Sequence, residues 1–146
     1  MSSVHIKEVS IDEALQVHLE IPEFDAIDHE LIEKRCGNKN TLIICAYLDG
    51  QKAGYLIGYD KFGGGSFYCW MAGVIPRYRR RGTLTSLMAY CMQWATTCGY
   101  AKLKIKTRNN RREMLSFLVA NEFNFIEVEQ KEPISQNRIS LERALN

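Results

Sequence analysis

Apolar and polar positions follow two different periods along the first part of the chain. Strict alternation in "VHIKEV" predicts a strand over residues 4–9. Ser10 then precedes "IDEALQVHLEI", with Glu13 at the spacing of a capping box, so a helix is expected to begin there. Pro22 should end or kink that helix. The segment "DAIDHELIEKRC", residues 25–36, predicts a second short helix.

The middle of the chain is dominated by apolar runs. "TLIICAYL" and "KAGYLIGYD" flank Asp49 and Gly50, a turn pair that predicts a β-hairpin. After the loop "KFGGGS", the unbroken apolar and aromatic run "SFYCWMAGVI", residues 66–75, predicts a central buried strand. From Leu84 onward the apolar residues recur at helical spacing, and Gly99 is a suitable stop.

The last third of the chain continues the alternation of strand and helix. "AKLKIKT" has a strand pattern, "RREMLSFLVANEF" a helical one, and "FNFIEVE" and "NRISLERAL" predict two final strands with a turn near Pro133. The predicted order is β-α-α-β-β-β-α-β-α-β-β. This order indicates an α/β (α+β) fold with helices covering a mixed sheet. With 146 residues and no linker or repeat, a single domain over residues 1–146 is expected.

Composition narrows the function classes. The net charge of +2 is too small for a protein that binds nucleic acid by bulk electrostatics, so no nucleic-acid partner is expected. No apolar stretch approaches the ~20 residues that cross a bilayer, and no export signal is visible, so no membrane partner is expected. Five cysteines without a CxxC motif favour a reduced, cytoplasmic setting with buried thiols. No metal is expected, because the three histidines and the cysteines lack ligand spacing.

The candidate chemistry is concentrated in "GVIPRYRRRGTL", residues 73–84. It lies between a predicted strand and a predicted helix. The first N–H groups of a helix have no internal partner, and the helix dipole adds positive charge there, so this position favours an anion. Gly82 allows close backbone approach, and the neighbouring arginines offer charge-assisted contacts to phosphate. The alternatives are a solvated arginine run and a nucleic-acid patch, of which the latter fits the small net charge least well.

The P-loop and Rossmann glycine patterns are both absent. The pattern V-x-P-x-Y-R-x-x-G, from Val74 to Gly82, instead resembles the acetyl-CoA signature of the GNAT superfamily of acyl-CoA N-acyltransferases. The predicted element order matches that family over nearly the whole chain. The resemblance implies a mixed, mostly antiparallel sheet of about seven strands flanked by about four helices.

The resemblance also implies an acetyl-CoA site. In the family, the pyrophosphate rests on the backbone amides of an [RQ]-x-x-G-x-[GA] loop, and the preceding strand pairs with the pantetheine arm. Leu84 departs from the usual small last residue of that loop. Gly73 within a strand suits a bulge or a close ligand approach. The implied cofactor-binding residues are Ala72, Gly73, Val74, Arg79, Arg80, Arg81, Gly82, Thr83, Leu84, Asn109 and Asn110.

The catalytic groups of the family are only partly present. Direct transfer to an amine needs a base, and a backbone N–H near Val74 is the expected donor to the oxyanion. Tyr68 stands where some members carry a glutamate base, and Leu118 stands where many carry a tyrosine acid. Glu23, just after Pro22, is the candidate base, although a solvent-facing carboxylate is an equal alternative. The candidate catalytic residues are therefore Glu23 and Tyr68.

The implied function is an N-acetyltransferase that transfers the acetyl group of acetyl-CoA to a primary amine of a small-molecule or peptide acceptor. The acidic segment over residues 20–33 would favour a cationic acceptor. The alternative is a non-catalytic CoA-binding regulatory protein, which the missing glutamate and tyrosine motivate. Exposed strand edges near the C-terminus make a homodimer an expectation.

Overall fold

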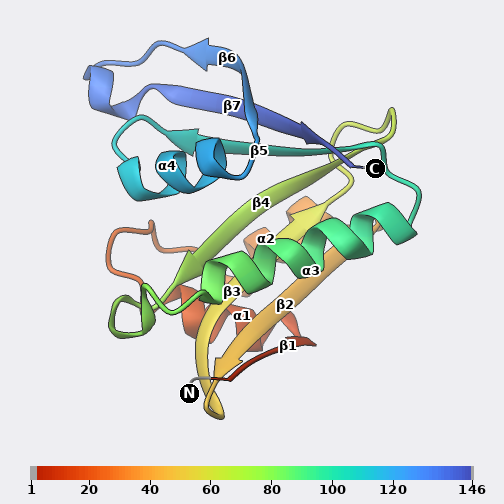
Figure 1. Ribbon diagram of the computed structural model, residues 1–146, viewed down its shortest axis with the longest axis vertical. Helices are drawn as coiled ribbons and strands as arrows, with labels where there is room; N and C mark the ends of the chain where they lie inside the picture. The colour runs from red at the N-terminus through yellow and green to blue at the C-terminus, as the bar shows by residue number, and fades with distance from the viewer. Residues whose placement is uncertain (1–2, 146) are drawn as a thin grey trace.

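The computed structural model describes residues 3–145 and contains one seven-stranded sheet with four α-helices (Figure 1). This confirms the predicted fold class and element order; two short 3₁₀ turns are additional. In chain order the elements are β1 (Val4–Glu8), α1 (Ile11–His18), α2 (His29–Cys36), β2 (Thr41–Leu48), β3 (Gln51–Tyr59), β4 (Ser66–Val74), η1 (Pro76–Tyr78), α3 (Thr83–Thr97), β5 (Lys102–Arg108), α4 (Arg112–Ala120), β6 (Asn124–Glu129), η2 (Ile134–Gln136) and β7 (Arg138–Ala144).

The predicted capping box begins α1. The Glu13 N–H donates to Ser10 Oγ (3.2 Å), and the Ser10 N–H donates to Glu13 Oε1 (3.4 Å). Both helices of the first part are shorter than predicted. Helix α1 ends at His18, and α2 begins only after Asp28, whose Oδ1 accepts from the Leu31 N–H (2.9 Å). The segment between them is a ten-residue loop, and this loop later borders the candidate site.

The sheet has the order β1-β2-β3-β4-β5-β7-β6, and its one parallel pair among the described strands is β4 with β5. That pairing is short: residues 66–69 of β4 lie beside residues 102–105 of β5. Beyond it the two strands separate (Figure 1), while β5 stays paired with β7 along its whole length. A wedge therefore opens in the middle of the sheet, between the carboxyl ends of β4 and β5.

A β-bulge in β4 lies at the start of this wedge. Met71 pairs with Ile57 and Cys69 pairs with Gly58, so Trp70 has no partner on β3. A bulge bends a strand and changes which face its side chains point to. Trp70 and Met71 consequently both pack with the cluster under α1 and α2. The sequence suggested a bulge or a close approach at Gly73; the bulge is at Trp70, and Gly73 is instead closely approached by protein.

Two hydrophobic clusters cover the two faces of the sheet. Helices α3 and α4 cover one face, and α1 and α2 cover the other (Figure 1). Four of the five cysteines are buried, as expected, and Cys98 is exposed. Burial raises the pKa of Cys45 to about 11 and that of Cys91 to about 12, so these thiols are core residues rather than nucleophiles.

The far edge of the sheet is formed by β6, whose residues are all exposed. Phe125, Ile126 and Val128 place large apolar side chains at this edge. It is the edge on which the expected homodimer would have to pair. Within residues 3–145, no helix has the length and apolar character needed to span a bilayer.

A buried polar contact fixes the loop after α1 to the sheet. The Nε2 atom of His18 lies 2.7 Å from the carbonyl oxygen of Asp25, and its Nδ1 atom lies 2.6 Å from the Tyr55 hydroxyl. Because a carbonyl oxygen only accepts, the imidazole donates from Nε2 to Asp25, and Nδ1 forms its hydrogen bond with the Tyr55 hydroxyl. Both ring nitrogens of His18 are thereby satisfied away from water.

We expect Tyr55→Phe to reduce the free energy of unfolding by about 1–3 kcal/mol, because it leaves the buried Nδ1 atom of His18 without a partner. Urea denaturation monitored by circular dichroism measures the change. The matched control is Tyr47→Phe, which removes a half-buried hydroxyl from the neighbouring strand and should change stability by less than about 0.5 kcal/mol. Equal losses in the two variants would contradict the proposed role of the histidine contact.

Candidate active site

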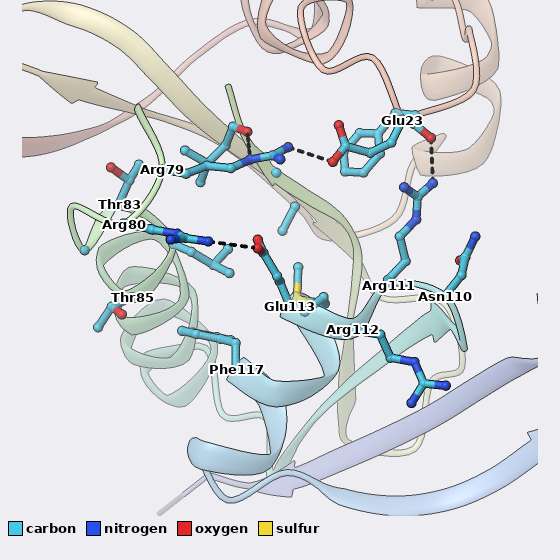
Figure 2. Close-up of a pocket in the computed structure, with 17 residues that line it drawn as sticks. Glu23, Arg79, Arg80, Thr83, Thr85, Asn110, Arg111, Arg112, Glu113 and Phe117 are labelled. Carbon is cyan, nitrogen blue, oxygen red and sulfur yellow. Dashed lines mark hydrogen bonds and ion pairs between the residues drawn. The ribbon is translucent and has the colours of Figure 1, made fainter. Parts of the chain in front are cut away.

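A cavity of about 670 Å³ lies beyond the open end of the wedge, between the end of β4 and the first turns of α3 and α4. The end of β4, the loop before α3, the first turns of α3 and α4, and the α1–α2 loop all contribute to its wall (Figure 2). Most of the residues that the resemblance assigns to acetyl-CoA meet here, whereas Arg81 and Asn109 are not part of the wall. The assigned residues that line the cavity are Ala72, Gly73, Val74, Arg79, Arg80, Gly82, Thr83, Leu84 and Asn110.

One wall of the cavity is the unpaired edge of β4. The Ile75 N–H donates to the Ala53 carbonyl on β3 (2.8 Å). Backbone groups point to alternate sides along a strand, so the N–H groups of Val74 and Ala72 point the other way, into the wedge. The Val74 carbonyl also points there and accepts from Arg79 Nε (3.0 Å). An extended ligand therefore has a strand edge to pair with at this wall.

The second wall is the N-terminus of α3. Arg80 (φ 66°) and Gly82 (φ 78°) both have left-handed backbone conformations, and α3 starts at Thr83 with no side-chain cap. No protein atom lies within 4 Å of the space where a Gly82 side chain would start, and the buried Thr83 Oγ1 has no hydrogen-bond partner among the described residues. Unpaired helix N–H groups, the helix dipole and a left-handed turn together form a site for an anion.

The arginines of this loop have different environments. Arg79 is half-buried and bridges two elements, because its Nη2 atom also bonds Glu23 Oε2 (2.9 Å) on the α1–α2 loop. Arg80 reaches across the cavity mouth to Glu113 on α4 (3.5 Å), with both side chains exposed. Arg77 forms an exposed pair with Glu20 (3.4 Å) outside the cavity wall. Of these three arginines, Arg79 is therefore the one that connects the loop before α3 to the α1–α2 loop.

Glu23 is held from two sides (Figure 2). Arg79 bonds its carboxylate, and Arg111 Nη2 donates to its backbone carbonyl (2.6 Å). Burial opposes ionisation of the Glu23 carboxyl, but a backbone hydrogen bond and the Arg79 and Arg111 charges outweigh it and hold its pKa below the usual value. A carboxylate with a lowered pKa and a guanidinium partner is a weak proton acceptor.

Phe24 closes the wedge beside Glu23. A Cβ atom on Gly73 would lie only 2.6 Å from Phe24 Cε2 and 2.7 Å from Ile21 Cδ1. The Arg111 guanidinium lies over the same ring, 5.3 Å from its centroid. Any side chain at position 73 would therefore have to displace Phe24 and Ile21 from the strand.

A second cavity, of about 340 Å³, continues from the first. The two share Phe24, Ala72, Arg111 and Met114, so they meet at Ala72 on β4. Tyr68, the other candidate catalytic residue, lines this second cavity. Burial raises its pKa to about 12, which makes the phenol a poor base at neutral pH. The two cavities are therefore continuous along β4, from Ala72 to Tyr68.

Most of the acidic residues expected to attract a cationic acceptor are engaged elsewhere. Glu23 bonds Arg79, Asp28 caps α2, Glu33 bonds His29, and Asp25 bonds Arg108 (3.1 Å). Asp25 is the one carboxylate in the wall of the second cavity, and six arginines and lysines face it there. The acidic segment therefore does not make the second cavity acidic, and the wall of that cavity is basic.

The basic residues of the second cavity were missed by sequence reasoning. Arg35, Lys61, Lys106 and Arg138 come from α2, the β3–β4 loop, β5 and β7. They are separated by 26, 45 and 32 positions, and each stands in an ordinary polar context. No local signal in the sequence could have grouped them, because only the folding of the sheet brings these elements together.

Helix α4 places no tyrosine in the wall of the first cavity. Leu118, at the position of the family's tyrosine, is fully buried in the core, and the α4 residues that line this cavity are Arg112, Glu113, Met114 and Phe117. Asn109 Nδ2 donates to the Ile134 carbonyl (3.2 Å), and the residue that caps α4 is Arg111, not an asparagine. Of the two asparagines, Asn110 is therefore the one that lines the first cavity.

Several solved structures have the same fold. Ard1 from Thermoplasma volcanium has a TM-score of 0.81 at 15% identity, with 98% of each chain covered. The ribosomal-protein-S18-alanine N-acetyltransferase of Escherichia coli has a TM-score of 0.83 at 14% identity, covering 99% of this chain and 95% of that one. A putative streptothricin acetyltransferase from Bacillus anthracis, in complex with acetyl coenzyme A, has a TM-score of 0.76 at 16% identity, covering 99% and 98%.

At such identities the structures establish the fold alone, and no curated protein sequence matches the chain. The family is established by sequence. Residues 9–123 match the acetyltransferase (GNAT) family. They include β4, the arginine loop and α3, the elements that form the two walls described above. Since this match spans most of the chain, the protein belongs to the GNAT family of acetyltransferases.

Proposed function

We propose that this protein transfers the acetyl group of acetyl-CoA to a primary amine by direct attack in a ternary complex. The observation that carries the proposal is the first cavity, in which an unpaired strand edge and an uncapped helix N-terminus lie side by side. Few ligands need both features. A pantetheine arm needs backbone partners along its amides, and a pyrophosphate needs N–H donors.

Each part of acetyl-CoA has a proposed partner. The N–H groups at the start of α3 and in the left-handed turn from Arg79 to Gly82 bind the pyrophosphate. The edge of β4 from Ala72 to Val74 pairs with the pantetheine, and Asn110 lies beside it on the opposite wall. The arrangement places the thioester at the point where the two cavities meet. An acceptor in the second cavity then approaches the acetyl carbon from the other side of Ala72.

The transfer needs no covalent intermediate on the protein. The neutral amine nitrogen attacks the thioester carbon, so a C–N bond forms and the C–S bond breaks. A backbone N–H of Ala72 or Val74, pointing into the wedge, donates to the oxyanion that develops on the carbonyl oxygen. The sulfur leaves as a thiolate and takes up a proton from water, since a free thiol has a pKa of only ~8.5 and no tyrosine is offered by α4.

Water is also the proposed acceptor of the amine proton. The carboxylates that line the two cavities are Glu23, Asp25 and Glu113, and each is paired with an arginine. We propose that Glu23 positions Arg79 and so orders the loop before α3, rather than removing the proton. Tyr68 is proposed to shape the acceptor cavity, because its phenol stays protonated.

When the protein is given acetyl-CoA and a panel of primary amines, we expect steady release of free CoA. The acetylated amine should gain a matching 42 Da in mass. Thiol release and mass spectrometry provide the two readouts. Calorimetric titration with CoA measures binding separately. Tight CoA binding without turnover on any amine would contradict the acetyltransferase proposal and support a CoA-binding regulator.

We expect Gly82→Pro to abolish CoA binding, whereas Arg77→Ala should leave the affinity within about twofold. Proline cannot adopt the positive φ of residue 82 and has no N–H. Arg77 lies outside the cavity wall in an exposed pair, and such pairs contribute little. Calorimetry measures both affinities, and circular dichroism checks the fold. If both folded variants bound CoA equally well, the loop would not be the pyrophosphate site.

Glu23→Gln should weaken acetyl-CoA binding by up to about fivefold, the size of a partly screened ion pair, because Arg79 loses its charged partner. Turnover at saturating acetyl-CoA should be unchanged between pH 6 and pH 9, because the lowered pKa of Glu23 keeps it ionised there and paired with Arg79. Steady-state kinetics separate kcat from the KM for acetyl-CoA. A large loss of kcat at unchanged acetyl-CoA affinity would instead show that Glu23 is the general base.

A further inference from the structure

The second cavity contains a group of four cations that we call the basic cluster: Arg35, Lys61, Lys106 and Arg138. None of the four forms an ion pair with a carboxylate of residues 3–145. The other two cations of the cavity are already engaged: Arg108 with Asp25 and Arg111 with the Glu23 carbonyl. The basic cluster is therefore an excess of positive charge directed at one cavity.

The members of the basic cluster lie close enough to act on one another. Burial and then the charges of Lys106, Arg35 and Arg138 lower the pKa of Lys61. Glu129 on β6 is near enough for Lys106 and Arg138 to contribute to its lowered pKa, but its carboxylate is bonded to Lys131 (2.7 Å). The repulsion between like charges that have no ion-pair partner is reduced when an anion binds between them.

The aromatic wall of the cavity holds two members of the basic cluster in place. The Arg35 guanidinium lies 5.2 Å from the centroid of the Trp70 ring, and Lys61 Nζ lies 4.9 Å from that of Tyr68. A guanidinium stacked on an aromatic plane keeps its N–H edges available for a carboxylate or a phosphate. The aromatic contacts thus orient these two exposed cations at the wall of the cavity.

The position of the basic cluster relative to the transfer point defines the shape of its ligand. Trp70 and Tyr68 stand two and four residues before Ala72 on β4. Because of the bulge at Trp70, the stretch from Tyr68 to Ala72 spans only three residues of β3, which corresponds to about 10 Å along the strand. The amine must reach Ala72, where the two cavities join. A molecule that satisfies both requirements has an amine at one end and a negative charge several bonds away.

We propose that the acceptor of this protein is a small primary amine that carries a carboxylate or phosphate group at its far end, bound by Arg35, Lys61, Lys106 and Arg138. The inference rests on the acetyl transfer proposed above and adds the chemical class of the acceptor. The basic cluster would bind the anionic end of the acceptor, and its amine would attack the thioester at the junction near Ala72.

The test compares straight-chain primary amines of equal length that end in a carboxylate, a phosphate, a methyl group or a second ammonium. With acetyl-CoA saturating, we expect kcat/KM for one or both anionic series to exceed that for the methyl series by at least about tenfold. The advantage should shrink as salt is added, because salt screens partly exposed charges. The carboxylate and phosphate arms show which anion is preferred.

Lys106→Gln and Arg138→Gln should each remove most of this advantage, so that kcat/KM for the anionic amines falls towards the value for the methyl-ended amine. The matched control is Lys104→Gln, which removes the same charge from the same strand outside the wall of the second cavity. CoA affinity, measured by calorimetry, should be unaltered in all three variants. This readout shows that the fold and the first cavity are intact.

Equal turnover of anionic, neutral and cationic amines would overturn the inference while leaving the acetyltransferase proposal in place. A preference for the diammonium series would overturn it as well. Binding of CoA without acetylation of any amine would refute the proposed function, and the inference with it. Competition by single-stranded RNA, with no anionic amine accepted, would show that the basic cluster is a nucleic-acid surface instead.

Discussion

The site depends on the separation of β4 from β5. These central strands pair over only four residue pairs, and the bulge at Trp70 marks where β4 begins to bend away. If the pairing continued to Val74, the N–H groups of Ala72 and Val74 would bond β5 and no cavity would exist. Because these N–H groups form no hydrogen bonds within the sheet, they are free to bind a thioester substrate.

The separation is maintained by contacts that cross it. Arg79 joins the Val74 carbonyl to Glu23, and Arg111 joins the Glu23 carbonyl to the face of Phe24. Phe24 in turn packs against the bare backbone of Gly73. These contacts tie the α1–α2 loop, the strand and α4 into one frame. The frame holds the wedge open and divides it into two cavities that meet at Ala72.

The two cavities differ in the groups that line them. The first uses backbone N–H groups and a helix dipole, so its chemistry changes little when side chains change. The second uses the side chains of the basic cluster and an aromatic wall, so its preference depends on residues from four elements. This division fits a common donor substrate and an acceptor particular to this chain.

The sequence alone determined the element order, the capping box at Ser10, the hairpin at Asp49–Gly50 and the loop before α3, because each depends on residues adjacent in the chain. It also showed that the usual acid and base were missing. The tertiary structure decided that the bulge lies at Trp70, that Glu23 is held by Arg79, and that the second cavity is basic. Those facts depend on residues far apart in sequence, and only the closed sheet brings their charges and backbone edges within reach of one another.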